Sequence, residues 1–355
     1  MTTFDVARRR LHNQLITRHS FEKPGDVVRW MGAVQAQDYR GGLWAVGLRV
    51  PDATEADVER AIAERNIVRT WPMRGTLHFV APEDVRWMLE LLTPRVVARS
   101  AGRHRQLGLD DATFSRSRRA VERALRDGRR LPRTAAYRAL EAAGIATTGQ
   151  RGIHILGWLA QKGVVCFGPR EGKQQTFVLL DEWVPAARAL ERDEALGELA
   201  ERYFASHGPA TLQDFTWWSG LTVADARSGL GMVASQFLHE VVDGRTYWFS
   251  SSAPAEKGAR AHLLPVYDEY TVAYKDRSAV LDPAYARQTG NGIFSPIVVI
   301  DGWVAGTWKR TLDKQAVTVV PDLFTPPSKT ESRALAAAAE RYGAFLGGGQ
   351  KTSHR

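Results

Sequence analysis

Two glutamines, Gln35 and Gln37, stand one residue apart in the apolar segment V-Q-A-Q-D-Y. A buried amide costs free energy unless it is hydrogen-bonded, so a pair of amides in such a segment indicates a site that holds something polar. A glutamine carbonyl can orient a water molecule, and its dipole can face a developing positive charge. The alternative is that both amides bond to backbone groups at an ordinary edge of the core.

Asp38 follows the pair directly and is the conventional choice for a general base, because a glutamine cannot remove a proton at neutral pH. Side chains of adjacent residues point in different directions in a helix and in a strand. We therefore expect Gln37 to position the water molecule, and we do not expect Asp38 to share that role.

Three other residues of this part of the chain can contribute to a site. Trp44 follows a predicted turn at Gly41 and Gly42, and the segment M-R-G-T-L-H-F-V contains Arg74 and His78. Each also has an ordinary structural interpretation: packing for Trp44, a hydrogen-bonded strand histidine for His78 and a bridge to a helix carboxylate for Arg74.

Other kinds of site are not indicated. The sequence has no G-x-x-x-x-G-K-[ST] loop, no dinucleotide fingerprint and no recognisable serine-hydrolase order. The nine histidines are scattered singly, and the one cysteine, Cys166, excludes an internal disulfide and a cysteine-rich zinc site. We therefore expect neither a metal nor a cofactor. With no export signal and no apolar run of membrane-spanning length, we also expect a cytoplasmic protein.

The chain is basic and of ordinary globular composition. Its 355 residues include 48 Lys and Arg against 39 Asp and Glu, a net charge of +9. This excess favours a polyanionic partner, although it can also serve only solubility in an arginine-rich chain.

Helices followed by a glycine-turned β-hairpin recur along the chain, which is the pattern of a winged helix. We predict an α+β fold of tandem winged-helix units at 1–81, 82–182 and 183–255. A β-rich region with a final helix follows at 256–346, and a disordered tail at 347–355.

The local signals behind these units are caps and turns. In the first unit we expect helices over 5–15, 24–34 and 54–64 and a strand pair over 68–80; in the second, helices over 82–99, 110–127, 133–142 and 148–162 and a hairpin over 164–180. The third is the clearest, because Thr211 and Thr222 each cap a helix on either side of Gly220, with a hairpin at 238–250 as the wing.

Five segments together resemble the winged-helix DNA glycosylases of the AlkZ and YcaQ types. They are Q-A-Q, R-G-T-L-H-F-V, P-A-T-L-Q-D-F-T-W-W-S-G-L, L-L-P-V-Y-D-E-Y with Y-K-D-R, and D-G-W-V-A-G-T-W-K-R. The likeness runs over about 5–342. It implies tandem winged helices in a C-shape around a channel for duplex DNA, with no metal. It also implies excision of N-alkylated purines, with unhooking of interstrand crosslinks in the AlkZ branch.

The resemblance also assigns residues. Gln35, Ala36 and Gln37 match the Q-x-Q form of the family motif, whereas the YcaQ-type motif has an aspartate at its last position. An N7-alkylated purine is already cationic and departs as a neutral base, so two amides suffice for such a labile lesion. We assign Gln37 to water positioning and Gln35 to the sugar or the same water, and we expect Tyr39 and Trp44 to face the lesion.

DNA binding is expected to rest on phosphate contacts from basic residues of wings and recognition helices. The candidates are Arg151, Arg170, Lys173, Lys275, Arg277, Lys309 and Arg310. We expect a nucleoid-associated monomer in base excision repair. The alternatives are a non-catalytic winged-helix regulator, which has no need of the glutamine pair, and a structural protein that self-associates through the C-terminal sheet.

Overall fold

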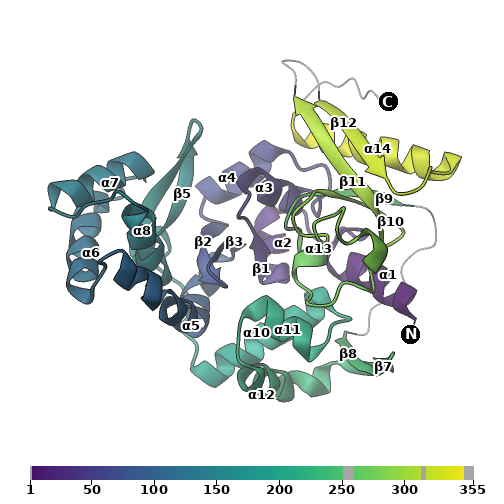
Figure 1. Ribbon diagram of the computed structural model, residues 1–355, viewed down its shortest axis with the longest axis horizontal. Coiled ribbons are helices and arrows are strands. Elements are labelled where there is room, and N and C mark those ends of the chain that lie inside the picture. Colours follow the sequence, from purple (N-terminus) through teal and green to yellow (C-terminus); the bar gives the residue numbers. More distant parts are fainter. Residues whose placement is uncertain (1, 251–259, 313–316, 348–355) are drawn as a thin grey trace. The chain divides into compact units, whose positions relative to one another are not determined.

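The computed structural model describes residues 2–250, 260–312 and 317–347 and contains both helices and strands (Figure 1), which confirms the predicted α+β class. The contacts divide the chain into two compact units, here called unit 1 (Met1–Val58 with Leu196–Arg355) and unit 2 (Glu59–Ala195). The division into two units does not test the boundaries predicted for the three winged-helix units, which stay a prediction. The predicted tail lies, apart from Gly347, outside the described residues.

Unit 1 begins with α1 (Thr3–Asn13), α2 (Pro24–Met31), β1 (Ala33–Gln35) and α3 (Tyr39–Gly47). The predicted helix over 24–34 is too long. It ends at Met31 because Gly32 has φ +72°, a left-handed conformation that favours glycine, and the chain then enters β1.

The predicted turn at Gly41 and Gly42 is wrong, because both glycines lie inside α3. Close packing favours a glycine at position 41. A Cβ atom there would lie 3.1 Å from Asp38 Oδ2 and 3.4 Å from Pro265 Cβ. The glycine therefore lets α3 begin close to the segment that carries the glutamines and to the residues after β9.

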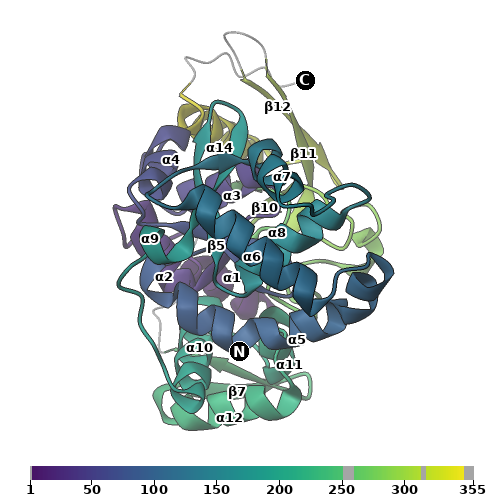
Figure 2. The same cartoon turned by 90° about the vertical axis from the view of Figure 1, so that its left-hand side faces the viewer.

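Unit 2 combines an antiparallel sheet with helices. The sheet has the neighbour order β3-β2-β5-β6-β4, and Figure 2 shows α5 and α6 in front of β5. The strands are β2 (Val68–Met73), β3 (Thr76–Val80), β4 (Leu131–Pro132), β5 (Val165–Glu171) and β6 (Gln174–Leu179). The helices are α4 (Glu55–Ala63), which enters from unit 1, η1 (Pro82–Asp84), α5 (Val85–Gln106), α6 (Asp111–Leu125), α7 (Arg133–Ala142), α8 (Arg151–Gln161) and α9 (Leu180–Trp183). Both predicted hairpins are confirmed.

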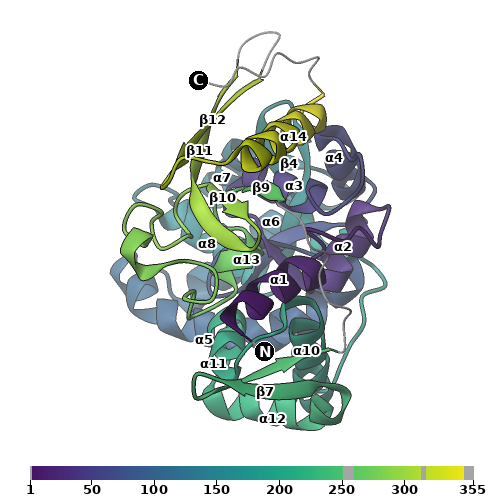
Figure 3. The same cartoon turned by 90° about the vertical axis from the view of Figure 1, so that its right-hand side faces the viewer.

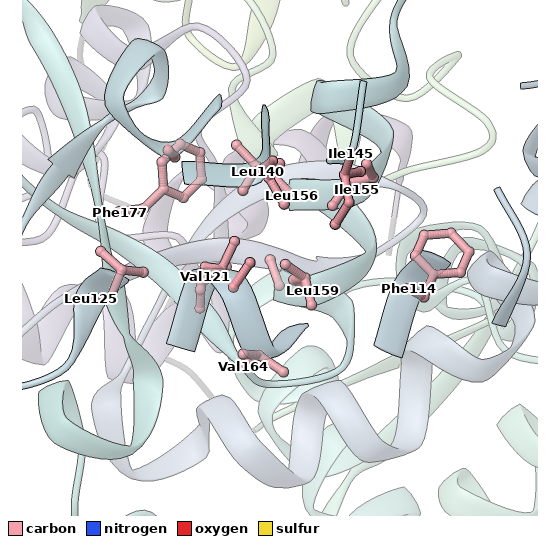
Figure 4. Packing of buried hydrophobic residues seen from close by; sticks show 14 of the residues in the cluster. Phe114, Val121, Leu125, Leu140, Ile145, Ile155, Leu156, Leu159, Val164 and Phe177 are labelled. Carbon is pink, nitrogen blue, oxygen red and sulfur yellow. The ribbon is translucent and has the colours of Figure 1, made fainter. Parts of the chain in front are cut away.

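The core of unit 2 lies between α6, α7, α8 and the sheet. Apolar side chains at helical spacing on α6 and α8, among them Val121, Leu125, Ile155 and Leu159, belong to one buried cluster with Phe177 of β6 (Figure 4). Burial of these side chains follows from the 3.6-residue period that predicted the helices.

A helix-turn-helix with a wing follows α10 (Arg192–His207). It consists of α11 (Leu212–Ser219), α12 (Val223–Val233), η2 (Ala234–Gln236), β7 (Leu238–Val242) and β8 (Arg245–Phe249). The Thr211 hydroxyl accepts from the Asp214 N–H at 3.1 Å, and the Thr222 hydroxyl from the Asp225 N–H at 3.0 Å. Gly220 ends α11 with φ +73°, so the predicted caps and glycine turn are confirmed.

The C-terminal part of unit 1 is a four-stranded antiparallel sheet with the order β12-β11-β10-β9. Its elements are β9 (Ala261–Leu264), α13 (Glu269–Val272), η3 (Pro283–Tyr285), β10 (Ile297–Ile300), β11 (Trp303–Leu312), β12 (Val317–Leu323) and α14 (Lys329–Phe345). Figure 3 shows α14 along this sheet, and the Tyr342 ring lies 4.9 Å from that of Trp308. The β-rich end and the final helix are confirmed. Within the described residues, no helix is both long and apolar enough to cross a bilayer.

Candidate active site

The two glutamines lie at the end of β1 in different environments. Gln35 is the last residue of the strand and is 6% exposed, whereas Gln37 is exposed. The expectation of two buried amides is therefore wrong for Gln37. The strand, whose three residues are all buried, ends at Gln35, and Gln37 stands in the bend between β1 and α3.

A buried carboxylate from α13 holds the backbone of this segment. Glu269 Oε1 accepts a hydrogen bond from the Gln35 N–H at 2.8 Å, and Oε2 accepts from Trp218 Nε1 at 3.0 Å. Glu269 is 0% exposed. This buried hydrogen bond joins α13 to β1.

The neighbouring residue, Asp268, holds the other end of α3. Its carboxylate forms two hydrogen bonds with Arg49, at 2.8 and 2.9 Å, and both side chains are 0% exposed. Asp268 Oδ1 also accepts from the Tyr270 N–H at 2.9 Å and so caps α13. Breaking a buried pair of this kind costs about 3–5 kcal/mol, because the remaining charge has no partner.

His207 at the end of α10 completes this buried polar cluster. Its Nε2 lies 3.5 Å from Glu269 Oε2, and its Nδ1 lies 2.8 Å from the Ser206 hydroxyl. Burial lowers the pKa of His207, and the hydrogen bond and charge of Glu269 oppose that shift. The ring stacks on Tyr203 with centroids 5.0 Å apart, which fixes its orientation.

A family model described as DNA glycosylase AlkZ-like matches residues 28–345. The chain belongs to the AlkZ-like DNA glycosylase family. The interstrand DNA cross-link repair glycosylase of Streptomyces sahachiroi is 28% identical over 363 residues, which cover 94% of this chain and 95% of that protein. The solved structure of the DNA glycosylase AlkZ from the same organism matches with a TM-score of 0.82 at 25% identity, covering 100% of this chain and 99% of that one.

Membership of the AlkZ-like family confirms the resemblance seen in the sequence and favours an enzyme over a DNA-binding regulator. The Q-x-Q motif of the sequence places the predicted site at Gln35 and Gln37. Sequence reasoning missed Glu269 there, although it used the segment that contains it. The available signal was two adjacent carboxylates within the apolar run L-L-P-V-Y-D-E-Y-T-V-A-Y.

Among the predicted supporting residues, Tyr39 begins α3 and is partly buried. Trp44 is 2% exposed, donates from Nε1 to the Leu263 carbonyl at 2.7 Å and packs edge-on against Tyr342 with centroids 5.0 Å apart. The structure thus places Trp44 in the packing between α3, β9 and α14. The prediction that Trp44 faces the lesion does not agree with this burial.

Arg74 and His78 belong to unit 2, at the hairpin of β2 and β3. Arg74 occupies the turn with φ +55°, and its Nη2 lies 3.3 Å from His78 Nε2. His78 is fully buried, and its Nδ1 lies 3.0 Å from the Thr76 carbonyl. These contacts agree with the interpretation of His78 as a hydrogen-bonded strand histidine.

Three of the arginines predicted to bind DNA are already engaged within their own unit. Arg151 donates from Nε to the Ala146 carbonyl at 3.0 Å, and Arg170 pairs with Glu59 at 3.1 Å. Arg277 donates to the Thr271 carbonyl at 2.9 Å, and burial lowers its pKa to about 10. Contacts of this kind leave these side chains less able to reach a phosphate than exposed lysines.

The remaining basic candidates differ in exposure. Lys173, at the tip of the β5–β6 hairpin, Lys275 and Lys309 are exposed. Arg310 on β11 is partly buried, with its guanidinium 5.7 Å from the Tyr342 ring. Its pKa is lowered first by burial and then by the charge of Arg40, while Asp38 opposes the shift. Arg310 therefore interacts electrostatically with Asp38 and Arg40, which follow Gln37 in the sequence.

Proposed function

We propose that this protein is a DNA glycosylase that hydrolyses the N-glycosidic bond of N7- or N3-alkylated purines in duplex DNA. The observation that carries the proposal is the Q-x-Q segment, Gln35 to Gln37, with Gln37 exposed at the end of a firmly held strand. The membership of the AlkZ-like family supports it.

The chemistry follows from the leaving group. An N7-alkylated purine carries a positive charge, so cleavage of the bond to C1′ releases a neutral base and needs no general acid. The sugar becomes oxocarbenium-like, and water then adds to C1′ and loses a proton to solvent. The carbonyl oxygen of Gln37 can accept a hydrogen bond from that water and face the cationic sugar, and Gln35 contacts the sugar or the same water.

The same reasoning limits the substrate range. An unmodified purine is a poor leaving group without protonation, and neither amide is an acid or a base at neutral pH. We therefore expect no release of undamaged bases. Because water is the nucleophile, we also propose a monofunctional enzyme that leaves an intact abasic strand. The name of the Streptomyces sahachiroi relative supports extending the proposal to the unhooking of interstrand crosslinks.

DNA binding is proposed to be led by phosphate contacts of a monomer, given the net charge of +9 and the exposed Lys173, Lys275 and Lys309. Such binding is sensitive to salt and has little sequence preference.

A panel of duplexes tests the proposal. Purified protein is incubated with DNA that contains N7-methylguanine, with a nitrogen-mustard crosslinked duplex and with undamaged DNA. We expect free N7-methylguanine and strand breaks that appear only after alkali. Failure to release a base from any alkylated duplex, by folded protein that binds DNA, would refute the enzymatic proposal. Strong preference for one sequence in that case would support a regulator.

A further inference from the structure

We propose that Glu269 is a positioning residue of this site: its buried carboxylate fixes the backbone at Gln35 and so places the amide of Gln37. The inference rests on the proposed function and adds a residue to it. Glu269 is 0% exposed, so it acts through the strand that it holds and is not itself a catalytic residue.

Two hydrogen bonds hold the side chain of Glu269 in place. Glu269 Oε1 accepts from the backbone N–H of Gln35 at 2.8 Å, two residues before Gln37. Its other oxygen accepts from Trp218 Nε1 at 3.0 Å. A carboxylate held at both oxygens has a fixed rotamer, so it can transmit a fixed position to the strand.

Two adjacent acidic residues, Asp268 and Glu269, contact the two ends of the segment that contains the bend and α3. Glu269 bonds to Gln35, before the bend, and Asp268 bonds to Arg49, after α3. Gln37 lies between these two points, in the bend that leads from β1 into α3. Displacements of about 1 Å in an active site can lower a rate about 100-fold, so a device that limits them has a catalytic consequence.

The buried position of Glu269 also has a cost in folding free energy. Burial of a carboxylate opposes folding unless the charge is well compensated, and apolar residues often stabilise such a position better. The carboxylate oxygens of Glu269 lie 3.0 Å from Trp218 Nε1 and 3.5 Å from His207 Nε2. A carboxylate in this place is more easily explained by the geometry it imposes on β1 than by stability alone.

The test uses Glu269→Gln in the full-length protein, assayed for single-turnover release of N7-methylguanine. The amide keeps an acceptor for one partner but presents an NH₂ group to the other, so the two hydrogen bonds cannot both remain. We expect the rate to fall at least 10-fold with the DNA dissociation constant changed less than 2-fold. The matched control is Glu331→Gln, which also accepts from a backbone N–H, that of Ser328 at 2.7 Å, but lies at the start of α14. Its rate should equal that of the wild type.

A double-mutant cycle separates positioning from a merely structural role. If Glu269 acts by placing Gln37, Glu269→Gln should add little to the loss caused by Gln37→Ala. Multiplicative losses in the double variant, or an unchanged rate in Glu269→Gln, would overturn the proposal.

Amide hydrogen exchange gives a readout that does not depend on activity. In Glu269→Leu, which removes both acceptors, we expect exchange at the Gln35 amide to accelerate at least 10-fold, while the Asp214 amide at the cap of α11 keeps its protection. If the wild-type protein releases no base, the proposed function fails and this exchange result still decides whether Glu269 holds the strand. Unchanged exchange at Gln35 would contradict the positioning role.

Discussion

Gln35 and Gln37 differ in exposure, and this difference separates their tasks in the proposed reaction. Gln35 is 6% exposed and is held through its backbone by Glu269, whereas Gln37 reaches solvent. A water nucleophile arrives from solvent, so Gln37 is the amide that can meet it. The sequence identified the pair from its residue types, but exposure depended on where β1 ends, and no local signal marks that point.

Basic residues at the β5–β6 hairpin allow a prediction about DNA binding. Lys173 is exposed, so Lys173→Ala should weaken binding and reduce the slope of log K against log salt by about 1. Arg170→Ala should instead lower the free energy of unfolding, because the ion pair with Glu59 at 3.1 Å is lost. Fluorescence anisotropy at several salt concentrations measures the first effect, and urea unfolding measures the second.

The control for this comparison is Lys329→Ala, at the exposed start of α14. It should leave both the affinity and the salt slope unchanged. An Arg170→Ala variant with wild-type stability but a reduced slope would show that this arginine binds phosphate after all.

At the scale of elements, the helix-turn-helix was predictable because its signals are local. Thr211, Gly220 and Thr222 specify two caps and a left-handed turn within twelve residues. In contrast, β1 has three residues and no sequence signature of its own. Its last residue bonds to Glu269, 234 residues later in the chain, and a local pattern carries no information on such a distant contact.

The turn between α11 and α12 gives a prediction with an internal control. Gly220 has φ +73°, so Gly220→Ala should reduce the free energy of unfolding by about 1–2 kcal/mol. Gly231 lies in α12 with nothing within 4 Å of an added Cβ, so Gly231→Ala should stabilise by about 0.5–1 kcal/mol. Chemical unfolding of both variants measures the difference. Equal effects would show that the turn conformation is not as described.

At the scale of the whole molecule, the two compact units divide the predicted residues. Gln35, Gln37 and Glu269 belong to unit 1, whereas Arg74, His78 and Arg170 belong to unit 2. The sequence could predict the elements of each unit from periodicity and turns. It could not predict this division, because unit 1 is assembled from two segments that stand before and after unit 2 in the sequence, and contacts between distant segments carry no local signal.

Acid should destabilise the protein through His262, which is partly buried. Burial, and then the charge of Arg260, lower the pKa of His262 from 6.5 to about 4. The unfolded chain therefore binds a proton between pH 6.5 and 4 that the folded protein excludes. The contribution of His262 to stability is complete above pH 6.5, falls as the pH drops to about 4, and amounts to at most about 3 kcal/mol.

Urea unfolding at pH 7.5 and pH 4.5 measures this effect. We expect His262→Gln to lose less stability than the wild type between these two pH values, and His239→Gln, at an exposed position on β7, to lose as much as the wild type. The same loss in His262→Gln as in the wild type would mean that other groups carry the acid sensitivity.

The single-turnover rate of N7-methylguanine release by Gln37→Ala shows most directly whether the reaction takes place at the glutamine pair. Removal of one preorganised group that stabilises a transition state lowers a rate by about 100- to 1,000-fold. We predict a loss of that size, with the free energy of unfolding and the DNA dissociation constant close to those of the wild type, because Gln37 is exposed and lies outside the core. A Gln37→Ala variant that releases the base at the wild-type rate would contradict the assignment of the chemistry to this site.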